Sequence, residues 1–228
     1  PAATPYVSDM HFLKLDLRNA LRHKLRTTLT VLGFVVAFLS FGLLQTIVDA
    51  WYAGAEGAAP DRLITRNAVS LVVPLPVHYR DKIRAIEGVK TVAGANWFAG
   101  VYQDPKNFFP QFAVDPVPYF SMFPEYRIPE DEFRAFMRDR KGAIVGRKLA
   151  ETHGWKLGDS VPLKGTIFPG NWEFTVRSIY DAGEAKTDTS QFFFHWDYLN
   201  ETMRSRAPQG ASQVGIFIVA VHDVDRDQ

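Results

Sequence analysis

The pattern of hydrophobic and polar positions divides the chain into three parts. Residues 27–48 form a run of 22 residues without a charged side chain. At about 1.5 Å per residue, a helix of this length covers the roughly 30 Å hydrocarbon core of a bilayer. Four of the small or polar residues within the run are Gly33, Ser40, Gly42 and Thr46, and such residues are tolerated in membrane helices. Residues 28–50 are therefore predicted to be a transmembrane helix.

Two other interpretations of this run remain open. A cleaved signal peptide has an apolar region of only about 7–15 residues, followed by small residues at the cut site. The Ala-Gly-Ala sequence at residues 53–55 resembles such a site, but the apolar run is longer and its basic flank is more extended. The remaining alternative is a helix buried in the core of a soluble protein. A retained membrane helix accounts best for the length.

The segment before the run shows the periodicity of an amphipathic helix. Its apolar side contains Met10, Leu13, Leu17, Ala20, Leu21 and Leu25, and its polar side contains Asp16, Arg18, Asn19, Arg22, His23 and Arg26. A basic amphipathic helix that leads into a span is typical of the membrane interface. We therefore expect residues 1–27 to be a cytoplasmic segment with an interfacial helix. A simple positive flank without a separate role is the alternative.

Charge is distributed unevenly, although the net charge of the whole chain is only +1. Residues 1–27 hold five basic side chains against two acidic ones, whereas residues 51–228 hold 21 basic and 22 acidic side chains. Basic residues close to a span favour the cytoplasmic side, so we expect a cytoplasmic N-terminus and a location in the bacterial inner membrane. Trp51 and Tyr52 stand where interfacial aromatic residues are expected. The low net charge argues against a nucleic-acid partner, and the absence of cysteine excludes disulfides and thiolate zinc sites.

Residues 51–228 are predicted to form a mixed α+β extracytoplasmic domain, which makes the chain α+β as a whole. Helices are expected at residues 76–88, 130–140 and 147–153. Strands are expected at residues 89–102, 111–115, 142–146, from 160 onward, 172–181 and 213–223, and residues 190–204 are expected to be a strand that runs into a helix. An Ala/Gly-rich linker is expected at 51–65, a proline-broken loop at 116–129, and a bulge at Gly94.

Several side chains of this domain are predicted to lie in its core: Ile83, Ile86, Phe133, Phe136, Met137, Trp155, Leu157 and His195. Strand alternation leads us to expect Phe174, Val176 and Ile179 on one side of their strand. Trp172 and Arg177 are expected on the other side.

The sequence offers no convincing catalytic, cofactor-binding or metal site, so the chain is not expected to be an enzyme. Gly158-Asp159-Ser160 imitates a lipase motif, but no D-x-x-H follows it. The aspartates at 223, 225 and 227 lack the glycine and glutamate of a calcium loop. The histidines show no paired metal spacing; they are His11, His23, His78, His153, His195 and His222. Asn200-Glu201-Thr202 is a formal glycosylation triplet, and no phosphate-binding glycine motif occurs.

Two blocks of sequence resemble the permease subunits of the MacB/FtsX/LolCE family of ABC transporters. Residues 13–38 are similar to the N-terminal segment of the family at Arg18, Leu21, Lys24, Arg26, Leu29, Thr30, Leu32 and Gly33. Residues 142–165 are similar to a block of the external domain at Val145, Gly146, Leu149, Ala150, Gly158, Asp159 and Leu163. Residues 114–120 also resemble the segment that precedes this second block. The resemblance covers nearly the whole chain.

The resemblance implies a permease subunit that passes the motion of a separate cytoplasmic ATPase to its external domain. It also implies a second permease subunit, identical or different, contact with membrane lipid, and a periplasmic adaptor or cargo protein. The family has three further membrane helices, and after Val48 no other run is long enough to span, so the chain is expected to be the N-terminal part of a longer protein. The alternatives are a singly anchored enzyme, for which catalytic residues are lacking, and a singly anchored binding or sensor module.

Overall fold

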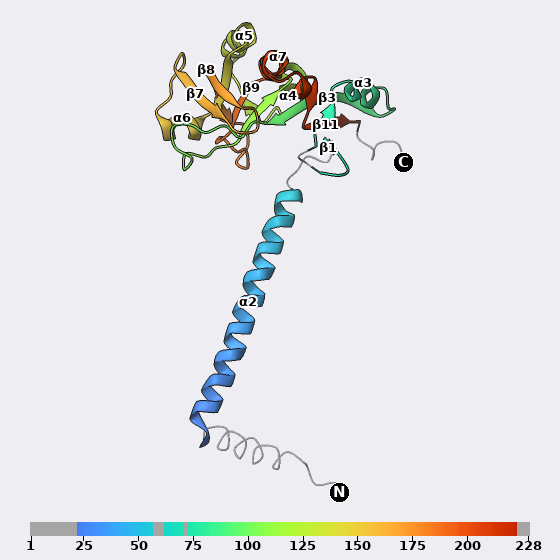
Figure 1. Ribbon diagram of the computed structural model, residues 1–228. Helices are drawn as coiled ribbons and strands as arrows, with labels where there is room; N and C mark the ends of the chain where they lie inside the picture. The colour runs from blue at the N-terminus through green and yellow to red at the C-terminus, as the bar shows by residue number, and fades with distance from the viewer. Residues whose placement is uncertain (1–21, 57–61, 71–72, 223–228) are drawn as a thin grey trace. The chain divides into compact units, whose positions relative to one another are not determined.

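The computed structural model describes residues 22–56, 62–70 and 73–222 (Figure 1). The chain divides into two compact units, Pro1–Ala59 and Pro60–Gln228, and each is described by itself. The described part of the first unit is dominated by helix α2, Lys24–Glu56, which contains 33 residues. Residues 10–21 of the predicted amphipathic segment lie outside the described residues.

The second unit is built around a mixed sheet, which contains nine strands among the described residues. Their order is β1-β11-β3-β4-β9-β6-β8-β5, with β7 paired to β8. The strands are β1 (Arg62–Arg66), β3 (Val89–Trp97), β4 (Gln111–Val114), β5 (Tyr126–Arg127), β6 (Gly142–Gly146), β7 (Ser160–Gly165), β8 (Gly170–Ala182), β9 (Phe192–His195) and β11 (Ile216–Val221). The β4–β9 and β6–β8 pairs are parallel, and the other pairs of this sheet are antiparallel. A separate pair joins β2 (Leu75–Pro76) to β10 (Gln213–Val214).

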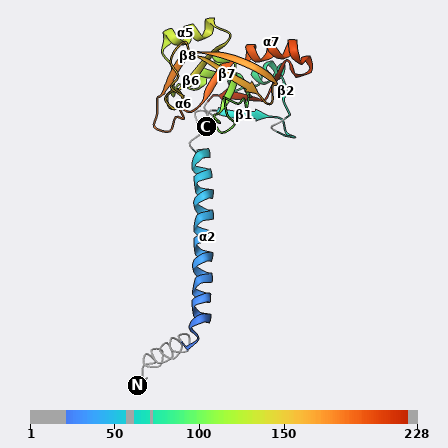
Figure 2. The same ribbon diagram turned by 60° about the vertical axis from the view of Figure 1, so that its left-hand side comes forward.

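Short helices cover the sheet, and α5 and α7 lie at the margin of the domain in both views (Figures 1 and 2). The helical segments are α3 (Tyr79–Arg84), α4 (Pro116–Met122), α5 (Glu130–Arg138), α6 (Arg147–His153), α7 (Trp196–Arg206) and the 3-10 turn η1 (Pro208–Gly210). The domain is thus mixed α+β and follows an apolar helix in the chain, as the sequence predicts.

Strand β9 shows where the core lies. Phe192, Phe193 and Phe194 are consecutive, and all three are completely buried. Because successive side chains of a strand point to opposite faces, a strand with this pattern must be covered on both sides. Phe192 and Phe194 belong to one cluster with residues of α6 and α7, whereas Phe193 belongs to another cluster with residues of α4 and α5. The sheet is therefore the middle layer of the domain.

Many of the predicted elements are confirmed. The helix expected at 130–140 is α5, and the strand at 142–146 and the helix at 147–153 are β6 and α6. Gly154 ends α6 in the left-handed conformation, with φ of 70°, which glycine adopts at little cost. The strand expected at 111–115 and the strand that continues into a helix near 196 are also present, as β4 and as β9 with α7.

The loop expected at residues 116–129 is wrong, because this segment contains α4 and β5. Pro116 occupies the first turn of α4, where the missing N–H of proline costs nothing. Tyr119 and Met122 are three residues apart and are both buried, so tertiary packing stabilises a helix that the proline content concealed.

The boundaries of several other elements differ from the predictions. The linker expected at 51–65 is wrong at both ends, because α2 continues to Glu56 and β1 begins at Arg62. The helix expected at 76–88 is shorter, and Pro76 belongs to β2. The strand expected at 89–102 ends at Trp97, and Gly215 separates β10 from β11 within the strand expected at 213–223.

Of the side chains expected in the core, Phe136, Trp155 and His195 are buried, and Ile83 and Phe133 are partly buried. Three expectations are wrong. Ile86, Met137 and Leu157 are 59%, 40% and 51% exposed, respectively. Each lies near the end of a helix or in a turn, where helical periodicity no longer determines which side faces the core.

The bulge is not at Gly94, which pairs regularly with Phe217. The extra residue of β3 is Lys90, because Ala220 pairs with Thr91 and the next residue of β11 pairs with Val89. A side chain at position 94 would come within 3.0 Å of the Val214 side chain. Close packing against β10 is therefore the physical reason for glycine there.

The expected placement of Trp172 is also wrong, because Trp172 packs in the same cluster as Phe174 and Val176. These three residues alternate in one phase along β8. Ile179 joins the same cluster, as expected, although it is out of phase with them. The register of β8 against β6 shifts by one residue at Arg177, and this bulge returns Ile179 to that side.

Candidate functional site

The first candidate site is the surface of α2. Its segment Lys24–Val48 is the one helix in the described residues that is long and apolar enough to cross a membrane. Large apolar side chains point outward along it, and Phe38 and Leu39 are 74% and 68% exposed. Exposing such surface to water costs roughly 25 cal/mol per Å². The surface is suited to lipid or to other membrane helices.

The polar groups of α2 are arranged in agreement with a lipid environment. The Thr30 hydroxyl donates to the carbonyl of Arg26 at 2.9 Å, and the Thr46 hydroxyl donates to the carbonyl of Gly42 at 2.8 Å. Such bonds to the preceding turn satisfy hydroxyl groups where water is absent. The basic residues Arg22, Lys24 and Arg26 are exposed at the N-terminal end. The side chains of Trp51 and Tyr52, like residues 14 and 18, lie outside the described part.

The second candidate site is the pair of strands by which the chain enters and leaves the sheet domain. Strand β1 follows α2 after only five residues, and it forms one edge of the sheet. It pairs with β11 in antiparallel register, so that Arg62 lies opposite Ala220 and Arg66 opposite Ile216. The first residue of the first strand and the end of the last strand are therefore neighbours at one end of the sheet.

An ion pair fixes this first strand to the rest of the domain. The two terminal nitrogens of Arg62 bind the two carboxylate oxygens of Glu125 at 2.6 and 3.2 Å. The Arg62 guanidinium also lies 4.6 Å from the centre of the Phe123 ring. The Arg62 and Glu125 side chains are only 18% and 20% exposed, so solvent screens the pair less than a surface ion pair. The sequence does not predict this pair, because its members are 63 residues apart and follow no local pattern.

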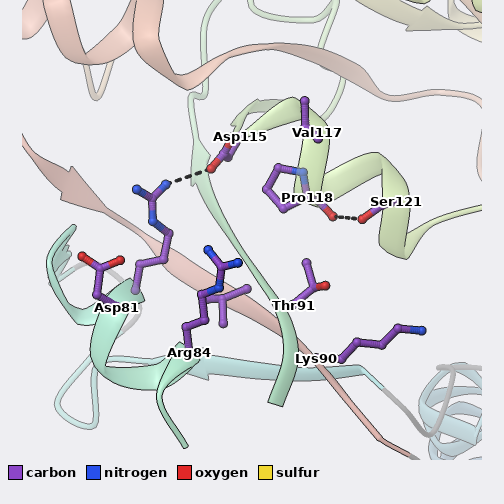
Figure 3. Close-up of a pocket in the computed structure, with 10 residues that line it drawn as sticks. Asp81, Arg84, Lys90, Thr91, Asp115, Val117, Pro118 and Ser121 are labelled. Atoms are coloured by element: carbon purple, nitrogen blue, oxygen red, sulfur yellow. Dashed lines mark hydrogen bonds and ion pairs between the residues drawn. The ribbon is translucent and has the colours of Figure 1, made fainter.

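The third candidate site is a cleft of about 430 Å³ between α3, β3 and α4 (Figure 3). Its geometry follows from unequal strand lengths. β3 has nine residues, but β4 pairs only with its last three, Ala95–Trp97. The chain then turns away at Asp115 into α4, so the earlier part of β3 has no strand beside it on that side. This unpaired part of β3 forms the floor of the cleft.

Charged side chains line much of this cleft. Arg80 of α3 binds the Asp115 carboxylate at 2.9 Å, which joins the two walls. The remaining charged residues that line it are Asp81, Arg84 and Lys90. Burial raises the pKa of Asp115, Arg80 lowers it, and the nearby Asp197 raises it further. The sequence does not predict this cluster either, because the three segments meet only in the folded sheet.

Residues with catalytic potential are not brought together. His195 is stacked on Phe136, and its Nε2 lies 2.9 Å from the carbonyl oxygen of Phe136. Burial lowers the pKa of His195, as expected for a packed core histidine. Gly158 and Asp159 form a turn, and Ser160 donates to Glu173 rather than to a histidine. No group of three metal-ligating side chains occurs among the described residues.

The remaining motifs are structural or lie outside the described part. Asn200 is buried at 7% exposure, and its Oδ1 accepts a hydrogen bond from the Ser212 N–H at 2.6 Å. A side chain held in this way caps the turn after α7 and is a poor glycosylation acceptor. The aspartates at 223, 225 and 227 and His11 lie outside the described residues.

Comparisons with known proteins find similarity in solved structures alone. No family model matches, and no curated protein matches. The extracellular domain of the noncanonical ABC-type transporter YknZ from Gram-positive bacteria has 13% identity and a TM-score of 0.46, with 72% of this chain and 83% of that chain covered. The periplasmic region of MacB from Actinobacillus actinomycetemcomitans has 10% identity and a TM-score of 0.49, with coverages of 74% and 78%.

A domain of a protein described as a permease from Porphyromonas gingivalis has 13% identity and a TM-score of 0.42, with 63% of this chain and 66% of that chain covered. All three neighbours are described as domains of a transporter or a permease. These scores describe a remote likeness, and the function of this chain is inferred from its own residues.

Proposed function

We propose that the chain is the membrane-spanning permease subunit of an ABC transporter of the MacB/FtsX type. In this role α2 crosses the inner membrane with a cytoplasmic N-terminus, and the sheet domain works outside. ATP is hydrolysed by a separate cytoplasmic subunit, and the permease transmits the resulting motion. A second permease subunit, membrane lipid and an external adaptor or cargo protein are the other proposed partners.

The observation that carries this proposal is the pairing of β1 with β11 directly after an apolar helix. In a domain inserted between two membrane segments, the chain must enter and leave the domain at neighbouring points. Arg62 and Ala220 are direct partners in the antiparallel register, which satisfies that requirement. A domain tethered at one end only has no such requirement, although close termini are common in domains generally.

The β1–β11 pairing also provides a mechanical route by which motion of the membrane segments reaches the sheet domain. When the two attached segments move together, the β1–β11 pair moves as one stalk and carries the whole sheet with it. The bidentate Arg62–Glu125 pair ties β1 to the segment between α4 and β5, so the load is shared beyond the β1–β11 hydrogen bonds. Separation of the two segments would instead open the strand pair from its end, one residue pair at a time.

Purification of the full-length protein from its native membrane in mild detergent tests the proposal. An ATPase is expected to co-purify, and its recovery should differ between samples with and without a non-hydrolysable ATP analogue. Deletion of residues 10–26 should reduce that recovery several-fold. Arg22 and Arg26 together changed to Gln should also reduce it, whereas Arg134 and Arg138, a matched pair on α5, should tolerate the same change. A protein that shows no nucleotide-dependent partner would overturn the proposal.

A singly anchored binding or sensor module is the second candidate function, and the cleft between α3 and α4 favours it. The two functions differ in what lies downstream in the gene. Three apolar segments after residue 228, with an ATPase reading frame beside them, would support the permease. A stop codon at that point would support the anchored module.

A further inference from the structure

We propose that the cleft between α3, β3 and α4 binds a phosphate group, with Arg84 as its principal contact. The ligand class is a phosphate monoester or diester, carried either by a small soluble molecule or by a lipid headgroup. This inference is independent of the proposed transport function, because it depends only on side chains within the sheet domain.

The volume and position of the cleft suit a small ligand. About 430 Å³ lies within the range of roughly 300–1,000 Å³ that ligand sites occupy. The floor is the part of β3 that precedes Ala95, where β4 no longer pairs with it. The Arg80–Asp115 bond holds α3 and the start of α4 together across the opening, so the site is formed before a ligand arrives.

When the charges that pair with each other inside the cleft are set aside, the remaining charges are mainly positive and favour an anion. Arg80 is neutralised by Asp115, to which it is bonded. Arg84 and Lys90, by contrast, have no carboxylate within 4.0 Å among the residues that the structure describes. Among the residues that line the cleft, one carboxylate, that of Asp81, remains against these two cations; Asp197 acts on Asp115 but does not line the cleft. Figure 3 shows the Arg84 side chain directed toward the side where Asp115 and Thr91 lie, away from Asp81.

The geometry of Arg84 decides the class of anion. A guanidinium presents a planar fork of N–H donors that matches two oxygens of a phosphate. Thr91 lines the same cleft and is half-buried, and its hydroxyl, which points away from Arg84 in Figure 3, forms no hydrogen bond within the described chain and is available as a separate donor. Lys90 extends away from Arg84 in Figure 3 and contributes to the positive potential rather than to the same contact.

The wall formed by α4 indicates which kind of organic group carries the phosphate. Val117 is 60% exposed and lines the cleft together with Pro118 and the buried Val92. Ser121 already donates its hydroxyl proton to the Pro118 carbonyl at 2.8 Å, so its oxygen can serve a ligand only as an acceptor. A neutral, weakly polar group such as glycerol fits beside these residues.

Titration of the full chain in a maltoside detergent at low salt tests this inference, with binding followed by calorimetry. One arm uses inorganic phosphate and glycerol phosphate, and the other uses a short-chain phosphatidylglycerol. Saturation by the soluble phosphates assigns the site to a soluble ligand, and saturation by phosphatidylglycerol alone assigns it to a lipid headgroup; either result supports the site. Absence of saturable binding in both arms overturns it.

A matched pair of variants on α3 identifies the contact. Arg84→Gln should weaken binding about tenfold, since a charge-assisted hydrogen bond is lost. Lys82→Gln removes the same charge two residues away, but Lys82 packs over the Tyr79 ring and does not line the cleft. It should change affinity less than about twofold, because only screened long-range charge is altered. Equal weakening by both variants would show a diffuse charge effect and overturn the site. Both side chains are exposed, so circular dichroism should show the same fold in each variant.

Discussion

Helix α2 and strand β9 use the same kind of residue in opposite ways. Phe38 of α2 is 74% exposed, whereas Phe193 of β9 is completely buried. Around Phe193 the rings of Phe112, Tyr119, Phe120, Tyr126 and Tyr180 lie with centroids 5.4–6.0 Å away. No such neighbours surround Phe38 within the described α2, where the surrounding medium must supply the apolar contacts.

This difference shows that hydrophobicity alone does not define a core. In the sheet domain apolar residues alternate or cluster so that neighbouring elements exclude water from them. In α2 they surround the helix on all sides, so an apolar solvent is required instead. Loss of side-chain volume should therefore destabilise the fold at Phe193 but have little effect at Phe38. A new charge at Phe38, by contrast, should hinder insertion of α2 into the membrane.

The largest effect is expected from Phe193→Ala. This change removes a ring from a packed core and leaves a cavity, which should lower the free energy of unfolding by about 3–5 kcal/mol. Phe38→Ala should change it by less than about 0.5 kcal/mol, because lipid or detergent fills the space. Denaturant unfolding of the detergent-solubilised chain, followed by tryptophan fluorescence, measures both.

The milder Phe193→Leu variant serves as a control, since it retains most of the volume and should lose less stability than Phe193→Ala. Equal losses at positions 193 and 38 would contradict the distinction between the two regions. They would indicate that α2 is packed against protein.

The next effect is expected from Phe38→Arg in the middle of α2. A charge at the centre of a span costs about 3 kcal/mol in insertion experiments. The membrane-inserted fraction, measured by alkaline extraction of isolated membranes, should therefore fall, and Phe38→Leu should leave it unchanged. If Phe38→Arg remains fully inserted, α2 must provide a partner or a water-filled path for the charge.

Sequence patterns predicted those elements whose signals are local. The charge-free run of α2, the acidic start of α5, and Gly154 after α6 all lie within a few residues of the feature that they define. Helix α4 was missed for the opposite reason. Its two prolines disguise a helix that depends on contacts of Tyr119 with β9, more than 70 residues later in the sequence.

The candidate sites were less accessible to prediction than the fold. The Arg62–Glu125 pair and the Arg80–Asp115 pair join residues 63 and 35 positions apart. Each member is an ordinary charged residue in its own segment, and only the strand order brings the partners together. That order includes the parallel β4–β9 pair, which no short-range turn signal specifies.

The smallest effect is expected from high pH, which should lower the stability of the sheet domain but leave α2 helical. Burial, the neighbouring Glu125 and Asp188 together raise the pKa of Tyr126 to about 12, against 10.0 for an ordinary tyrosine. Between these values the unfolded chain loses the Tyr126 proton and the folded domain keeps it, so stability falls as pH rises from 10 toward 12. Tyr126→Phe removes this titration and should reduce the loss by about 2 kcal/mol. Residues 24–48 of α2 contain no tyrosine, so this part of the helix should keep its circular dichroism in detergent while the domain unfolds. An unchanged alkaline slope in Tyr126→Phe would show that the Tyr126 proton is not held by the fold.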